Sequence, residues 1–258
     1  MIAVGFHPEV LWTDWGLVWD NRSLLLHGLL LALEVSAVAL VLSVVVGLFV
    51  AVARMGKRPL SSIAGIYVNV FRGIPALVSV LWVYFGWSIV FDFNFTVFQA
   101  AVIALTLLYS AFISEIYRAA LQAIPKGQRE AGLALGMHPA RIFLRVTLPQ
   151  ATKIAIPNIG SMFIGMVKDT STFTIIGLVE VVRVTQNINS TTFKPFVLYT
   201  AAAVIYVAAA FAIDFLFRGI EKVLTTPPSG WVANVVGGRR KRRIELLVKG
   251  VRAIGAAG

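Results

Sequence analysis

The sequence predicts an all-α integral membrane protein with about five transmembrane helices. Of its 258 residues, 58% are hydrophobic and 14% are charged, whereas a soluble domain is nearer to half apolar and a quarter charged. The mean hydropathy is +0.83. The excess apolar surface must face lipid. A spanning helix needs roughly 20 apolar residues, so the chain has room for about five spans and their loops.

Five apolar segments give that number. They cover residues 24–52, 63–90, 97–113, 154–182 and 196–217. We expect these spans to form one transmembrane domain over residues 23–220. Residues 1–22 precede it as an extracytoplasmic segment, and residues 221–258 follow it as a cytoplasmic basic tail.

The positions of the basic residues predict the orientation. The loop between the second and third spans has no basic residue and one acid, Asp92. Lys and Arg collect on the cytoplasmic side of membrane proteins. We therefore expect the N-terminus outside and the C-terminus in the cytoplasm, and we assign the net charge of +11 to orientation rather than to nucleic-acid binding. The loops after the first and third spans hold the basic residues Arg54, Lys57, Arg58, Arg118, Lys126, Arg129, Arg141, Arg145 and Lys153.

The two ends of the chain carry weaker signals. Trp12, Trp15 and Trp19 have helical spacing, which is typical of a short helix in the outer headgroup region, although a disordered lead-in is the alternative. In the tail, a basic run at residues 239–243 precedes apolar residues at helical spacing. That segment either lies on the anionic inner leaflet or is a solvated tail.

The longest cytoplasmic loop, about residues 120–153, is predicted to form a helix–turn–helix. Pro125 precedes a run of good helix formers and suits a helix start. Gly136 suits a left-handed helix end. A second short helix is expected over residues 140–146, before Leu148 and Pro149. The loop has more apolar residues than a solvated loop needs, so a partner surface is expected to cover them.

This loop resembles the EAA loop of bacterial ABC importer permeases, which reads Glu-Ala-Ala, three residues, Gly, nine residues, Ile, one residue, Leu-Pro. Two positions depart from that pattern, because Gly132 replaces the third-position Ala and Val146 replaces Ile. The resemblance implies that the loop docks into an ATPase subunit. The implied docking residues are Glu130, Ala131, Gly132, Gly136, Met137, His138, Leu148 and Pro149.

Other segments are similar to polar amino acid permeases of this class. They are residues 71–75 (Phe-Arg-Gly-Ile-Pro), 115–118 (Glu-Ile-Tyr-Arg), 124–128 (Ile-Pro-Lys-Gly-Gln) and 167–171 (Val-Lys-Asp-Thr-Ser). The resemblance implies a permease in the bacterial plasma membrane that pairs with a second permease. Two ATPase subunits and an extracytoplasmic substrate-binding protein would complete the importer, and an amino acid or similar small solute would be the cargo.

ATP is expected to bind elsewhere. The sequence contains no Gly-x-x-x-x-Gly-Lys-Ser/Thr phosphate loop. If ATP drives transport, ATP and Mg²⁺ belong to the partner ATPases, and this chain binds no cofactor and is no enzyme. The alternative for the 120–153 loop is a structural one, in which it packs only on its own spans.

Polar residues inside the spans are candidates for the translocation path, because intramembrane charges usually face a cavity or a partner. Glu34 either contacts a substrate amino group, makes a helix–helix hydrogen bond or lies at the outer interface. Arg72 either reaches the membrane boundary or a substrate carboxylate. Asp214 is expected to pair with Arg218. The candidates for the path are Lys168, Asp169, Thr170, Ser171, Glu34 and Arg72.

Two other functions compete with the permease. A membrane-embedded enzyme would need clustered acids, histidines or nucleophiles, but His7, His27 and His138 are scattered without metal-ligand spacing. A channel or structural membrane subunit is compatible with the helix breaks but leaves the 120–153 loop unexplained. The residues do not choose among acidic, basic and neutral amino acids, or between a homodimer and a pair of related permeases.

Overall fold

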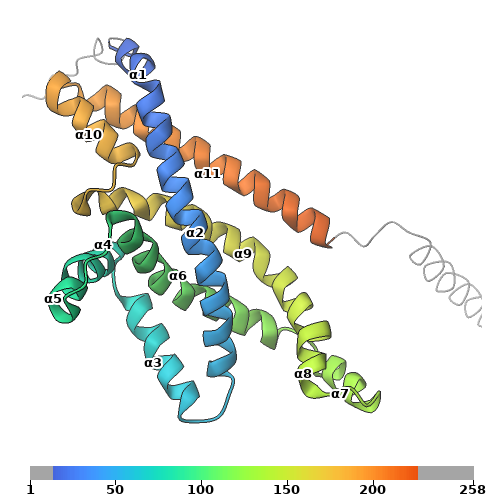
Figure 1. Ribbon diagram of the computed structural model, residues 1–258. Coiled ribbons are helices and arrows are strands. Elements are labelled where there is room, and N and C mark those ends of the chain that lie inside the picture. The colour runs from blue at the N-terminus through green and yellow to red at the C-terminus, as the bar shows by residue number, and fades with distance from the viewer. Residues whose placement is uncertain (1–13, 226–258) are drawn as a thin grey trace, which may run out of the picture. The chain divides into compact units, whose positions relative to one another are not determined.

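The structure, a computed structural model, describes residues 14–225 (Figure 1). This part is all helical, in agreement with the predicted fold class. By packing, the chain divides into two units, Met1–Arg218 and Gly219–Gly258. Trp12 and the tail beyond residue 225, with its predicted basic run, lie outside the described residues.

The predicted number of spans depends on how bent helices are counted. Within residues 14–225, three helices are long and apolar enough to cross a membrane, and two bent pairs raise the number to five if each pair is one span. The first bent pair turns by 109° and the second by 49°. The three single helices are α2 (Arg22–Arg54), α6 (Val97–Gln122) and α11 (Pro195–Thr225).

The N-terminal end of the described chain is a single helical turn. The helix α1 (Gly16–Asp20) contains Trp19 and directly follows Trp15, and both indole side chains are exposed. This agrees with a short helix in this region.

The centre of the fold is the packing of α2 on α6. Small side chains recur along one face of α2 and are fully buried, which lets two helix backbones approach closely, as in many membrane proteins. A Cβ added to Gly47 would lie 2.9 Å from the Ser110 backbone oxygen of α6. The small residues of this stripe are Ala32, Ser36, Ala39, Ser43, Gly47 and Ala51.

The second span is broken where the sequence predicts it. Helix α3 (Leu60–Gly73) ends before Ile74 and Pro75, which are both extended, and α4 (Ala76–Leu81) then begins. Proline has no N–H and disfavours helical backbone in the residue before it, so the helix stops here. The polypeptide continues through the π-helix η2 (Trp82–Gly86) and α5 (Trp87–Phe91).

The helix that carries the fourth span starts much earlier than its apolar segment. The expectation of a separate short helix before that span is wrong. Instead α8 (Pro139–Ile142), the π-helix η3 (Phe143–Thr147) and α9 (Leu148–Asp169) form one uninterrupted helical run. Pro149 has no N–H and cannot donate the backbone hydrogen bond of a regular helix. The π turn just before it is a local irregularity that lets the helix continue past this residue.

The break near residue 168 is a change of helix type followed by a turn. At Thr170 the α-helix becomes the 3₁₀-helix η4 (Thr170–Ile176), which ends at Gly177 with φ of 91°. A further helix, α10 (Val181–Thr192), follows where the sequence interpretation placed a loop.

The carboxylate of Glu180 caps α10. It is buried and accepts hydrogen bonds from the N–H groups of Val182 at 3.0 Å and Arg183 at 2.9 Å. The Tyr206 hydroxyl of α11 also donates to it. This buried carboxylate therefore ties the start of α10 to α11.

Candidate functional site

The tip of the long polar loop is built by two short helices. Helix α7 (Lys126–Ala134) follows Pro125 and α8 follows His138, as the sequence predicts. Gly136 has φ of +73° and its N–H donates to the Leu133 oxygen at 2.9 Å, while the Met137 N–H donates to the Gly132 oxygen at 3.0 Å. This paired pattern is a Schellman motif. The prediction of a left-handed glycine at the end of α7 is confirmed.

The second helix of the tip is capped by His138. The Ala140 N–H donates to His138 Nδ1 at 3.3 Å, and Pro139 occupies the first turn. The half-buried Met137 connects the two helices. The tip is thus a defined structure rather than a loose loop.

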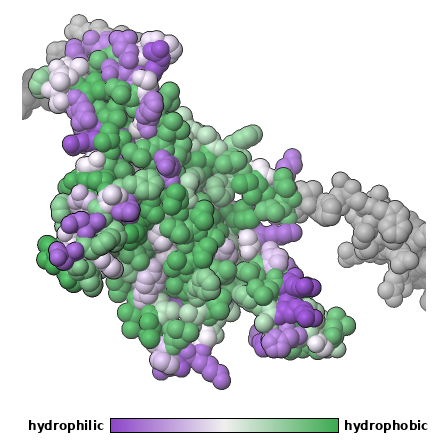
Figure 2. Space-filling model, viewed as in Figure 1, coloured by the Kyte–Doolittle hydropathy of each residue, from purple (hydrophilic) through white to green (hydrophobic). Residues whose placement is uncertain are grey.

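The tip exposes large apolar side chains on its surface. Leu135 is 80% exposed and Leu133 is 45% exposed. Glu130 and Ala131 are exposed next to them. Figure 2 shows hydrophobic surface close to strongly hydrophilic surface over this end of the molecule. Within residues 14–225 the Glu130 carboxylate has no hydrogen bond or ion pair, so it is free to meet another molecule.

Gly132 has a packing role that the sequence motif does not reveal. A Cβ at this position would lie 2.8 Å from Ile142 Cδ1. Ile142 is buried, and α7 therefore rests on α8 through a position without a side chain. The sequence alone shows Gly132 only as a departure from the Glu-Ala-Ala pattern.

Leu148 and Pro149 do not belong to the tip. They form the first turn of α9, where Thr152 Oγ1 donates to the Leu148 oxygen at 2.9 Å. Gln150 Nε2 donates to the Val146 oxygen at 2.8 Å, which satisfies a carbonyl beside the π turn. These two residues thus lie in the shaft that connects the tip to the membrane helix.

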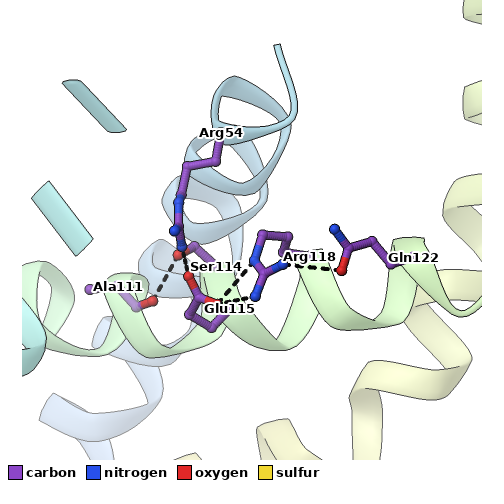
Figure 3. A network of polar contacts seen from close by, with 6 residues as sticks. All are labelled: Arg54, Ala111, Ser114, Glu115, Arg118 and Gln122. Carbon is purple, nitrogen blue, oxygen red and sulfur yellow. Dashed lines mark hydrogen bonds and ion pairs between the residues drawn. The ribbon is translucent and has the colours of Figure 1, made fainter. Parts of the chain in front are cut away.

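A charged network joins the ends of α2 and α6 (Figure 3). Glu115 pairs with Arg54 of α2, and its Oε2 accepts hydrogen bonds from Arg118 at 2.8 and 3.0 Å. Arg118 also donates to Gln122 at 3.1 Å. The sequence interpretation did not single out this network, although Glu115 and Arg118 have the i, i+3 spacing of a helical ion pair.

A cavity of about 280 Å³ lies at the break of the second span. Ile74, beside Pro75, lines it together with Phe112 of α6 and Asp169 of α9. Tyr109 donates from its hydroxyl to Asp169 Oδ2 at 2.9 Å. A Cβ on Gly165 would lie 2.7 Å from that hydroxyl, so the absence of a side chain there gives Tyr109 its position.

Asp169 is the member of the predicted Lys168–Ser171 group that lines this cavity. Lys168 is exposed and is not part of the cavity lining. Thr170 is buried, and its hydroxyl donates to the Val167 oxygen at 2.7 Å. Ser171 donates to the Lys168 oxygen at 2.6 Å. The hydroxyls therefore satisfy carbonyls at the end of α9, which explains how several polar residues fit here.

The other predicted intramembrane charges lie in different places. Arg72 does not line the cavity, but its guanidinium carbon lies 5.5 Å from the centre of the ring of Phe112, which does. Glu34 is exposed on α2, is not part of the cavity lining and has no ion pair within residues 14–225. The predicted pair of Asp214 and Arg218 is confirmed, at 2.7 Å.

The chain matches known proteins along most of its length. Residues 43–225 match the family described as binding-protein-dependent transport system inner membrane component. A glutamine transport system permease protein of Escherichia coli K12 is 35% identical over 211 residues, which cover 81% of this chain and 96% of that protein. An arginine transport system permease protein of Bacillus subtilis 168 is 33% identical, over 78% of this chain and 92% of that protein.

Solved structures agree with these relatives. A crystal structure of an amino acid ABC transporter with histidines matches with a TM-score of 0.74 and 34% identity, over 81% of this chain and 98% of that chain. An inward-facing methionine ABC transporter has a TM-score of 0.71 at 24% identity, over 80% of this chain and 99% of that chain, and it supports the fold. The chain therefore belongs to the binding-protein-dependent transport system inner membrane components, as a permease subunit rather than an enzyme.

Proposed function

We propose that this chain forms half of the translocation path for a polar amino acid in a bacterial plasma membrane. A second permease, of the same or a related chain, forms the other half. Two ATPase subunits hold ATP and Mg²⁺ and receive the α7–α8 tips, and an extracytoplasmic binding protein delivers the substrate. The N-terminus lies outside and the basic residues lie in the cytoplasm, as positive-inside orientation requires.

The observation that supports this proposal most is the uninterrupted helical run from Pro139 to Asp169. One end of the run belongs to the exposed tip, and the other carries the carboxylate that lines the cavity. At 1.5 Å rise per residue the run is roughly 45 Å long. When the ATPases close on ATP, a displaced tip moves this shaft, and the shaft changes access to Asp169. Release of the substrate to the cytoplasm follows hydrolysis.

The cavity suits the ammonium group of an amino acid. Asp169 supplies an anion in surroundings that are otherwise mostly apolar, such as those formed by Phe112 and Met162. Arg72, stacked on Phe112, supplies a cation for the carboxylate group of the substrate. Relatives named for glutamine and arginine transport support the amino acid class.

Glu130→Lys tests the docking of the tip. Glu130 has no polar partner within the described chain, so its replacement should leave the permease folded and in the membrane. Reversal of a charge in a desolvated contact typically costs several kcal/mol, so uptake and co-purification of the ATPase should both be lost. Gln128→Lys is the matched control on another side of α7. Normal uptake by Glu130→Lys would remove the basis for docking at this tip.

Asp169→Asn tests the path. Loss of a charged hydrogen-bonding partner costs about 1.5–3 kcal/mol, so the apparent affinity for substrate should fall about 10- to 100-fold in reconstituted vesicles. Lys168→Gln, beside it but outside the cavity, should transport with nearly unchanged affinity. If Asp169→Asn also transports normally and selects the same substrate, Asp169 is a packing residue.

A further inference from the structure

A second cavity, of about 490 Å³, lies at the base of the tip, apart from the Asp169 cavity. It is partly open, and it is lined by the residue after α2, Met55, by the end of α6 at Leu121, and by Ile142 and Phe143 of the α8–η3 run. Its size falls within the range of about 300–1,000 Å³ that is usual for small-ligand sites. Neither the docking of the ATPase nor the translocation path uses it.

The charges around this cavity have one sign. Lys126 and Arg129, both from α7, line it, and none of its lining residues is acidic. Gln122 also lines it, and this side chain is held by Arg118 of the Glu115 network at 3.1 Å. The remaining lining is mainly apolar. A ligand that fits both features carries a negative group and an apolar body.

The position of the cavity indicates which ligand this is. Met55 and Leu121 each lie where an apolar spanning helix ends, which is the level of the lipid headgroups. The loops on this side carry the basic residues, which predicts the cytoplasmic leaflet, and that leaflet is rich in anionic lipid. Basic pockets between transmembrane helices on this side are known to suit lipid headgroups.

We propose that this cavity binds an anionic phospholipid of the inner leaflet. Its phosphate lies between Lys126 and Arg129, and its acyl chains run along the apolar wall formed by Leu121 and Phe143. The basic tail of the same chain is a poor occupant, since its charge has the same sign as that of the cavity. A free phosphate would leave the apolar wall unused.

Native mass spectrometry of the detergent-purified chain, titrated with phosphatidylglycerol or with phosphatidylcholine, tests this site. The wild type is expected to retain phosphatidylglycerol in preference to phosphatidylcholine. Lys126→Gln/Arg129→Gln should weaken that retention about 25-fold, about fivefold for each cation. The matched control is Arg141→Gln/Arg145→Gln, which removes the same charge from exposed positions of the same loop that do not line the cavity. It should bind like the wild type.

A variant that keeps both cations separates a cavity from a merely basic surface. Thr147 lines the cavity, and Thr147→Trp fills space there. It should also lose phosphatidylglycerol. The proposal is overturned if the Lys126/Arg129 variant retains the lipid, if the Arg141/Arg145 control loses it equally, or if Thr147→Trp binds normally. Inorganic phosphate that competes as well as the lipid would also contradict it.

Discussion

At the scale of single residues, the positions without side chains decide how closely the helices approach. A Cβ on Gly28 of α2 would lie 2.8 Å from the backbone nitrogen of Val181 and 2.9 Å from the carbonyl carbon of Glu180. Backbone atoms cannot move aside as a flexible side chain can. Gly28 therefore brings α2 against the start of α10, beside the buried Glu180 carboxylate.

Gly28→Ala should destabilise the permease by about 1–3 kcal/mol, the usual cost of overpacking a close contact. Gly65→Ala is the control, because a Cβ there meets nothing within 4 Å and alanine improves helix propensity by up to about 1 kcal/mol. In thermal unfolding in detergent, the midpoint temperature should fall for Gly28→Ala and rise for Gly65→Ala. Equal stabilities would mean that α2 and α10 are not in contact as described.

Some of these residue roles follow from the sequence and others do not. The left-handed Gly136 was predictable, because few residues other than glycine end a helix in this way. The sequence could not show which of residues 168–171 lines the cavity and which bond backbone carbonyls. All four are polar, and their roles depend on which side chains the end of α9 and η4 bury. The role of Glu180 in joining α10 to α11 was not predictable either, because its partner Tyr206 lies 26 residues away.

At the scale of elements, α7 and α8 form a unit through Gly132 and Ile142. An alanine at 132 would place its Cβ 2.8 Å from Ile142 Cδ1, so either the isoleucine or α7 must move. This contact helps to set the geometry of the exposed tip. If the tip docks as we propose, a change here alters docking without touching Glu130.

Gly132→Ala alone should weaken ATPase co-purification and uptake severalfold, by displacing α7. Ile142→Ala removes both Cδ1 and the Cγ1 atom that would lie 2.9 Å from the new Cβ, so Gly132→Ala/Ile142→Ala should recover much of the activity. Ile142→Ala alone should cost about 2–5 kcal/mol of stability. Both activities are measured on the same membranes. Failure of the double variant to recover would show that the two positions act independently.

The sequence predicted the apolar spans better than the elements between them. Long apolar runs identify α2, α6 and α11 directly. Helix α10 was missed because β-branched and polar residues fill it, and because its N-cap Glu180 is buried against the distant Tyr206. The continuity from α8 into α9 was missed because Pro149 normally suggests a break, whereas here it stands in the first turn of α9 after a π segment.

At the scale of the whole permease domain, the tip and the cavity are two ends of one helical run. The tip has exposed apolar side chains and the Glu130 carboxylate, which has no partner among the residues that the structure describes, and the cavity holds Asp169 beside Tyr109. The π segment at Phe143–Thr147 and Pro157 are the irregular points of the shaft. In the mechanism that we propose, movement at the tip reaches Asp169 across these points.

The number of ATP molecules hydrolysed per amino acid imported tests this transmission most directly. Lys153 is exposed on α9 between the tip and the cavity, and proline there would break the shaft at a cost of about 3 kcal/mol. In reconstituted vesicles, Lys153→Pro should keep its ATPase subunits and hydrolyse ATP while importing little substrate, whereas Lys153→Ala should remain coupled. Import by Lys153→Pro at the wild-type ratio would contradict transmission along Pro139–Asp169.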